Sequence, residues 1–259
     1  MQEKLRKLRS FNGFMGFLHL IQGAGMLYVA LTVDKFRDFP APVFTNFLQF
    51  NEKLMILENV TKEVFTLPFA VLVAVFLFLS AFFHFLIAAP KVNDVYNAQL
   101  AKGMNQFRWY EYSLSSSLMI VLIAYLFGVN DLATLILIFG LNATMNLFGL
   151  MMEKYNQYTS KTEWANFWFG TFAGLIPWVV VLMFAFGNSD PAETPWFVYA
   201  IVGSYAVFFN TFPINMILQY KKVGPWRDYL FGERGYVVLS LVAKSVLAWL
   251  VFAGLMQPK

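Results

Sequence analysis

The chain has 259 residues, of which 59% are hydrophobic, 19% aromatic and only 13% charged. A soluble domain carries about 25% charged residues, so this composition excludes an ordinary soluble protein and predicts a polytopic membrane protein. Without cysteine, disulfides and thiolate metal sites are excluded, and two histidines are too few for a metal cage. The net charge of +4 is explained by membrane topology and anionic headgroups, so no nucleic-acid partner is expected.

Seven apolar stretches are long enough to cross a bilayer as helices. They run from Ser10 to Val33, Val64 to Ala89, Gln106 to Phe127, Leu132 to Met152, Trp164 to Ser189, Thr194 to Tyr220 and Gly235 to Met256. Pro177 and Pro213 lie inside spans, where membrane helices tolerate a kink. The pattern predicts an all-α, seven-transmembrane-helix bundle that forms a single domain over residues 1–259.

The basic residues predict the orientation of the bundle. With the N-terminus inside, 13 of the 19 Lys and Arg residues fall on the cytoplasmic side and five on the outer side. The positive-inside rule therefore predicts a multi-pass protein of the cell membrane, with a cytoplasmic N-terminus and an extracellular C-terminus. The basic N-terminal stretch leads into a span too long for a signal peptide, so no cleavage is expected.

One connection, the first outer loop over residues 34–63, is much longer than the others. It contains two apolar, β-prone runs, Val43 to Phe50 and Leu54 to Val60, separated by Asn51-Glu52-Lys53. This pattern predicts a β-hairpin lying on the outer surface. The alternative is a loose loop, which would expose many Phe and Leu side chains to water.

The last span carries a lysine, Lys244, near its middle. A lysine there costs roughly 2.5 to 3.5 kcal/mol on insertion scales, and both ends of the span are too distant for its stem to reach water easily. An ionisable residue inside a membrane indicates function by default. Lys244 is either a structural lysine paired to a carbonyl or carboxylate, or an amine that condenses with an aldehyde to form a Schiff base.

Glu111 is the single carboxylate that we assign to the interior of a span, because the other 14 acidic residues fall in loops, tails or span edges. A buried cation needs a buried anion, so Lys244 and Glu111 are predicted to pair. Further polar residues occur at the same depth, within one helical turn of one of these two. They are Arg108, Ser115, Ser116 and Ser240.

Both histidines, His19 and His84, fall on the Glu111 side of the membrane. Each is either a satisfied core residue or, with Arg108, part of a proton-holding cluster. Aromatic, small and polar residues on the third to sixth spans are candidates to line a flat apolar ligand site, although plain packing explains any single one of them. They are Tyr112, Met119, Asn142, Met145, Gly149, Trp168, Phe209 and Phe212.

Seven spans with a lysine in the middle of the last resemble the microbial rhodopsins. Inverted topology, a long first outer loop and the motif Arg108-Trp-Tyr-Glu111-Tyr-Ser-Leu-Ser115-Ser-Ser resemble one group of these, the heliorhodopsins. Ser240 before Lys244, the two inner histidines, and Phe209-Asn-Thr-Phe212-Pro213 in place of a Trp-x-x-Tyr-Pro motif also match. The likeness covers nearly the whole chain.

The resemblance implies a light-sensing photoreceptor with retinal, all-trans in the dark, as a protonated Schiff base on Lys244 and with Glu111 as its counterion. It further implies a homodimer and a signalling or regulatory role with an unknown cytoplasmic partner, and no enzymatic activity. One alternative is a light-driven proton transporter or channel on the same scaffold. Another is a retinal-free transporter in which Lys244 and Glu111 form an ion-coupled pair.

Two further expectations follow from residue placement. Small and polar residues on the fourth span could permit close helix contact between two copies: Gly140, Asn142, Thr144 and Gly149. Between Lys244 and the outer surface, the spans contain no Asp, Glu, His or Lys. A vectorial proton pump needs proton-holding groups on both sides of the reacting nitrogen, so no net pumping is expected.

Overall fold

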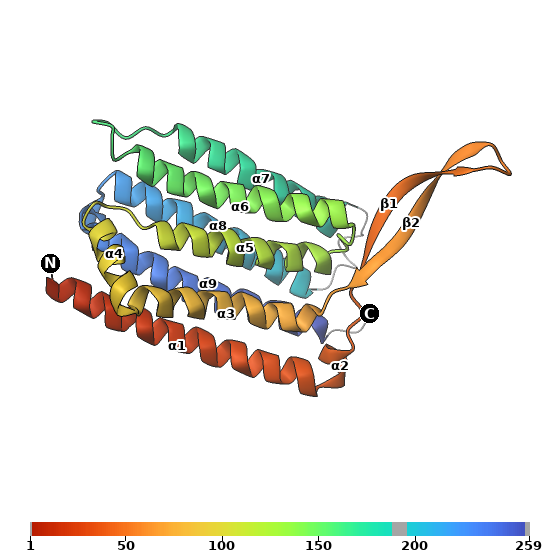
Figure 1. Ribbon diagram of the computed structural model, residues 1–259, viewed down its shortest axis with the longest axis horizontal. Helices are drawn as coiled ribbons and strands as arrows, with labels where there is room; N and C mark the ends of the chain where they lie inside the picture. The colour runs from red at the N-terminus through yellow and green to blue at the C-terminus, as the bar shows by residue number, and fades with distance from the viewer. Residues whose placement is uncertain (1, 188–195, 257–259) are drawn as a thin grey trace.

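The computed structural model describes residues 2–187 and 196–256, and it contains seven helices of at least 20 residues. These helices run side by side along one long axis (Figure 1). They are α1 (Gln2–Thr32), α3 (Phe69–Ala88), α5 (Gln106–Leu126), α6 (Leu132–Tyr155), α7 (Ala165–Phe186), α8 (Trp196–Tyr220) and α9 (Tyr229–Leu255). The prediction of an all-α, seven-helix membrane bundle is confirmed.

Neighbours along the chain pack against one another: α1 contacts α3, α5 contacts α6, α6 contacts α7, and α8 contacts α9. The last helix also touches α1, α3 and α5. We call the end of the bundle where α1 begins the amino end, and the opposite end the hairpin end. A short helix, α4 (Pro90–Leu100), crosses the amino end, and α2 (Asp34–Arg37) lies at the hairpin end (Figure 1).

Six of the long helices in the described residues are apolar enough over their length to span a membrane. The seventh, α5, falls short because it carries Arg108, Glu111 and several serines. These side chains are buried inside the bundle rather than facing lipid, which is the arrangement expected of polar residues within a membrane. The helix α5 therefore contributes charged and hydroxyl side chains to the interior of the bundle.

Polar side chains that accept hydrogen bonds from the first turn define three helix starts. Asn105 accepts from the Arg108 backbone N–H of α5, Asp131 from Thr134 of α6, and Asp228 from Leu230 of α9. Lys4 also donates to Asp228 over 2.8 Å, and this contact lowers the pKa of the Asp228 carboxyl. The ion pair ties the start of α1 to the start of α9.

Three helices extend past the expected span edges, and one of them is α1, which begins at Gln2 rather than Ser10. The last helix begins at Tyr229 rather than Gly235, and α6 continues to Tyr155 rather than Met152. Charged residues had been used to place those edges, but here Glu233 and Glu153 continue their helices and turn inward, where both are buried. The prediction that Glu111 is the only carboxylate inside the bundle is therefore wrong.

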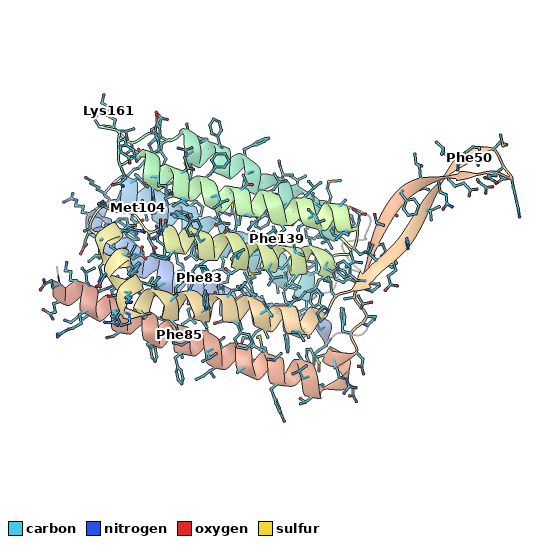
Figure 2. The ribbon with its side chains drawn as sticks, in the orientation of Figure 1. Phe50, Phe83, Phe85, Met104, Phe139 and Lys161 are labelled. Atoms are coloured by element: carbon cyan, nitrogen blue, oxygen red, sulfur yellow. The ribbon has the colours of Figure 1, made fainter. Side chains whose placement is uncertain are left out.

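The long loop forms the antiparallel hairpin that the sequence predicts, from β1 (Pro42–Asn51) and β2 (Ile56–Thr66). Its base is anchored, because the Phe44 N–H donates to the Asn130 carbonyl and the Tyr125 hydroxyl donates to the Pro42 carbonyl, each over 2.9 Å. The expectation that the hairpin lies flat on the surface at this end of the bundle is wrong (Figure 1). The hairpin instead projects away from the helices and carries Phe50 far from them (Figures 1 and 2).

The four small and polar residues of α6 lie on two different faces of the helix. Gly140 and Thr144 are exposed, whereas Asn142 and Gly149 are buried against neighbouring helices. A single contact surface made from all four is therefore excluded. Only the outward pair is available to a second copy of the chain.

Replacing Gly149 with alanine should destabilise the protein by about 1–3 kcal/mol, because the added methyl group overpacks the core. An ideal Cβ at Gly149 would lie 2.2 Å from Cζ3 of Trp109. Gly140→Ala is the matched control on the same helix, since nothing lies within 4 Å of its Cβ position. Thermal unfolding followed by circular dichroism should separate the two variants, and equal midpoints would contradict this account of α5–α6 packing.

Candidate functional site

Lys244 is buried near the middle of α9 and forms an ion pair with Glu111 of α5. Its Nζ also donates to the Ser80 hydroxyl over 2.6 Å, and Ser80 donates to Glu111 Oε1 over 2.7 Å. The Tyr112 ring lies 5.2 Å from Nζ. Four side chains from α3, α5 and α9 thus hold one cation and one anion in contact, away from water.

Ser80 was missed in the analysis of the sequence. It lies on α3, one helical turn before His84, and these two are the only polar residues between Phe69 and Ala88. A Ser and a His one turn apart in an otherwise apolar helix share a face, and this signal could have identified it. Its hydroxyl contacts both charged partners, so it orients the pair.

A cavity of about 390 Å³ lies beside Lys244, between α5, α6, α7, α8 and α9. Its volume falls within the range of cofactor sites, and its walls are mainly apolar. Ten of the residues singled out in the sequence line it: Tyr112, Ser116, Met119, Asn142, Met145, Gly149, Trp168, Phe209, Phe212 and Lys244. The wall of the cavity therefore carries the Lys244 amine at one point and mainly aromatic and aliphatic side chains elsewhere.

The lining is not equally deep at every position. Trp168 is 63% exposed, and Ile214 is also exposed, so the cavity reaches the outside of the bundle between α7 and α8. Asn142 lies at the opposite wall and donates to the hydroxyls of Ser116 and Ser117. The buried amide joins α6 to α5 behind the cavity.

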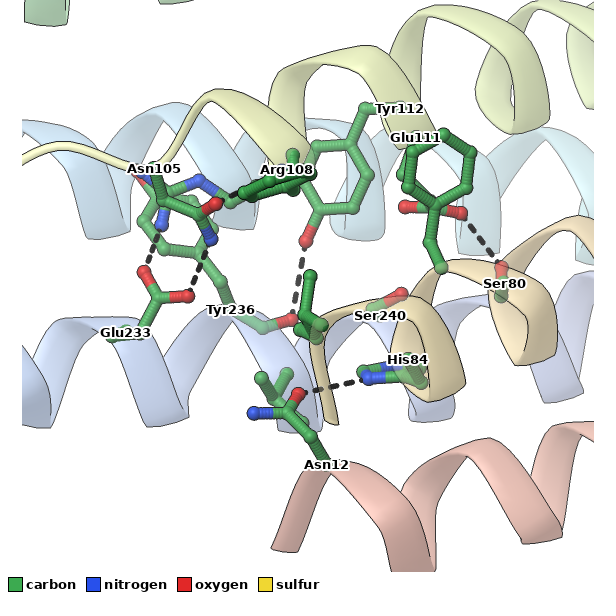
Figure 3. A pocket seen from close by; sticks show the side chains of 14 residues that line it. Asn12, Ser80, His84, Asn105, Arg108, Glu111, Tyr112, Glu233, Tyr236 and Ser240 are labelled. Atoms are coloured by element: carbon green, nitrogen blue, oxygen red, sulfur yellow. Dashed lines mark hydrogen bonds and ion pairs between the residues drawn. The ribbon is translucent and has the colours of Figure 1, made fainter. Parts of the chain in front are cut away.

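A second, smaller cavity of about 40 Å³ lies on the amino-end side of the ion pair (Figure 3). Its lining combines apolar side chains with the polar side chains after which we name it the polar cavity, among them Ser80, His84, Glu111, Glu233 and Ser240. The volume is large enough for at least one water molecule. This polar cavity links the Lys244–Glu111 pair to the buried carboxylate of α9.

The two histidines lie together next to this polar cavity. Their rings stack at 5.5 Å between centroids, and both are buried. The His84 Nδ1 forms a hydrogen bond of 2.9 Å with the Asn12 side chain (Figure 3), whereas neither ring nitrogen of His19 has a hydrogen-bond partner. The expectation of histidines on the Glu111 side of the bundle agrees with this placement. Their proton-holding role stays a prediction.

Arg108 does not belong with the histidines. Its guanidinium pairs with Glu153 of α6 and Glu233 of α9, and it lies over the Tyr236 ring at 3.9 Å. Asn105 bridges the same two carboxylates, donating its backbone N–H to Glu153 and its side chain to Glu233. We call Arg108, Glu153 and Glu233 the arginine cluster. Arg108 therefore pairs with these two carboxylates, whereas Glu111 pairs with Lys244.

Tyr96 of the short helix α4 contacts the arginine cluster through Glu233. Its hydroxyl donates to Glu233 Oε1 over 3.0 Å. Burial, with the Glu233 carboxylate beside it, raises the pKa of the Tyr96 phenol well above its usual range, so this group keeps its proton. The short helix α4 thus closes the amino end over the polar cavity.

The hairpin side of Lys244 has a different character. In the part of the chain that the structure describes, every buried Asp, Glu, His, Lys and Arg lies at Lys244 or toward the amino end. The space toward the hairpin is packed with hydrophobic residues of α1, α3, α5 and α9, including Met26, Val73, Ile123 and Val251. Among the described residues, a proton therefore meets no buried carboxylate, histidine, lysine or arginine on that side.

Of the remaining predicted residues, Ser240 lines the polar cavity, while Ser115 is fully buried and lines neither cavity.

A comparison with protein-family models gives a match to the model described as Heliorhodopsin over residues 8–256. Among curated proteins, none matches the chain.

Proposed function

The chain belongs to the heliorhodopsin family, whose members are retinal-binding rhodopsins, and from this premise we propose that it is a light sensor in which Lys244 holds the chromophore and Glu111 is its counterion. One observation carries the proposal: the only lysine buried in the described bundle interior lies between an anion and a cavity of about 390 Å³. Retinal bound there supplies light absorption and isomerisation.

The residues around the nitrogen of Lys244 have separable roles in this proposal. Glu111 stabilises a positive charge on the nitrogen through opposite charge, and Ser80 holds the nitrogen and the carboxylate in register. The mainly apolar walls of the larger cavity exclude water from the opposite side. A proton leaving the nitrogen can therefore move only into the polar cavity, toward the histidines and the arginine cluster.

We expect a sensory role rather than ion transport or enzymatic catalysis. Net pumping needs proton-holding groups on both sides of the nitrogen, and the hairpin side is packed with hydrophobic residues. Purified protein reconstituted with retinal should form a coloured, light-responsive pigment. All-trans retinal should be the isomer extracted from it in the dark.

Illuminated vesicles that contain the pigment should show no sustained pH change that a protonophore abolishes. A proton released from the Lys244 nitrogen returns from the same side, so no net transfer across the membrane results. The measurement is external pH under repeated illumination, with a known light-driven proton pump as the positive control. A protonophore-sensitive signal that scales with light would refute the sensory proposal and favour the transporter alternative.

The orientation and assembly are also proposals. Exposed Lys and Arg of the described residues gather at the amino end, which supports a cytoplasmic N-terminus and a cytoplasmic signalling partner. An N-terminal tag should then be accessible only in permeabilised cells. The apolar hairpin and the outward Gly140 and Thr144 support a homodimer, which a monomeric mass in nanodiscs would contradict.

A further inference from the structure

The arginine cluster contains one more anion than cations. The side chains of Arg108, Glu153 and Glu233 are each at most 3% exposed, and within the described residues no second basic side chain forms an ion pair with either carboxylate. If both carboxylates were ionised, the cluster would carry a net charge of −1 away from water. An uncompensated buried charge costs several kcal/mol, so the free energy of the cluster is lower when one of the two carboxylates binds a proton.

The hydrogen bonds to Glu153 do not accommodate that proton. Its Oε2 accepts from the Asn105 backbone N–H over 2.9 Å and from the Trp109 indole N–H over 2.8 Å. Its Oε1 accepts from Arg108, with the Tyr229 hydroxyl 3.4 Å away. An amide N–H, an indole N–H and a guanidinium can only donate, so the one group that could accept a proton from Glu153 is the Tyr229 hydroxyl, at a distance of 3.4 Å.

Glu233 has a closer hydroxyl partner that can reverse its role, at 3.0 Å rather than 3.4 Å. Its Oε2 accepts from Arg108 and its Oε1 accepts from the Asn105 side chain over 2.7 Å, but the third partner is the Tyr96 hydroxyl. A hydroxyl both donates and accepts. A proton on Glu233 Oε1 can therefore be donated to the Tyr96 oxygen, while Asn105 and Arg108 keep their bonds.

We propose that Glu233 is a proton-binding site, protonated in the dark, that closes the amino end of the polar cavity. The charged and titratable groups that face it are Tyr96 of α4, Arg108 of α5, Glu153 of α6, and Tyr229 and Tyr236 of α9. Glu111 and His84 lie across the polar cavity (Figure 3). Glu111, bound to Lys244, is the ionised end of this cavity, and Glu233 is its neutral end.

The assignment deepens the proposed function, and its light-dependent part rests on that function. A proton that leaves the Lys244 nitrogen exits through the polar cavity to the amino-end surface, and Glu233 can then replace it as donor. In that step the Glu233 O–H bond breaks, and the proton passes by water to the nitrogen or to Glu111. The Tyr96 O–H, which keeps its proton, then donates a hydrogen bond to the ionised Glu233, and a proton taken up from the amino-end surface binds Glu233 and restores the resting state. Every transfer lies on one side of Lys244, as non-pumping behaviour requires.

The test is an infrared measurement in the dark on the full-length protein at neutral pH. Spectra of protein with and without ¹³C-labelled glutamate carboxyl groups isolate the carbonyl band of protonated glutamic acid. We expect one such band in the parent protein and its loss in Glu233→Gln, whose neutral amide keeps partners at Arg108 and Tyr96. Absence of the band from the parent protein overturns the proposal, and so does its survival in Glu233→Gln.

A matched pair of tyrosine variants identifies the carboxyl group even if Glu233→Gln does not fold. Tyr96→Phe removes a hydrogen bond from Glu233 and should shift the band to higher frequency. Tyr229→Phe removes the hydroxyl next to Glu153 and should leave it in place. The reverse pattern assigns the proton to Glu153 and overturns the proposal. Failure of the proposed function would appear separately, as a visible pigment that does not depend on Lys244.

Discussion

Replacing Lys244 with alanine should abolish the retinal pigment. Covalent attachment needs an amine, and Lys244 is the only buried lysine among the described residues. The measurement is visible absorption after incubation with retinal, followed by extraction. Lys222→Ala, at an exposed position near the amino end, is the control and should keep its colour. A visible band that resists extraction in Lys244→Ala would disprove the assignment.

Loss of colour must be separated from loss of fold. Removing Lys244 leaves Glu111 buried without its cation, and breaking a buried pair in this way costs about 3–5 kcal/mol. The double variant Lys244→Ala/Glu111→Gln removes the uncompensated charge, so it should recover much of the lost thermal stability. It should nevertheless remain colourless, because the second substitution restores stability but does not restore the amine to which retinal attaches. Recovery of colour in the double variant would contradict attachment at Lys244.

Replacing Glu111 with glutamine should change the pigment strongly without preventing retinal from binding. Glutamine keeps the size of the side chain but removes the negative charge that stabilises the cationic nitrogen. The pigment should then be either red-shifted or unprotonated and near-ultraviolet at neutral pH. In the second case, acidification should restore visible absorption, because lower pH returns the proton that the missing anion no longer holds.

Ser80→Ala is the matched control for Glu111→Gln. It removes a hydrogen bond to both Lys244 and Glu111 but leaves the charge of the pair unchanged. Its spectral shift should therefore be the smaller of the two, and its pigment should stay protonated at neutral pH. An unchanged spectrum together with an unchanged pH titration in Glu111→Gln would rule out Glu111 as the counterion.

The sequence by itself determined the class of protein and the pair at its centre. Long apolar stretches have one stable form in a bilayer, so the seven-helix architecture could be predicted from composition and length. A lysine and a glutamate deep within apolar spans are expensive unless they pair, and Lys244 and Glu111 are in contact. The two β-prone runs of the long loop, separated by Asn51-Glu52-Lys53, likewise predicted the hairpin.

Only the tertiary structure decided which polar residues share the interior. Charged residues near the ends of spans look like loop residues because a sequence does not show what a neighbouring helix supplies. Glu153 and Glu233 are far apart in the chain, and both are buried because Arg108 meets them from a third helix. Similarly, Gly140 and Gly149 look alike along α6, but only Gly149 lies against a neighbouring ring, that of Trp109. Burial and pairing depend on how helices are placed around one another, and that is a property of the assembled bundle rather than of any one span.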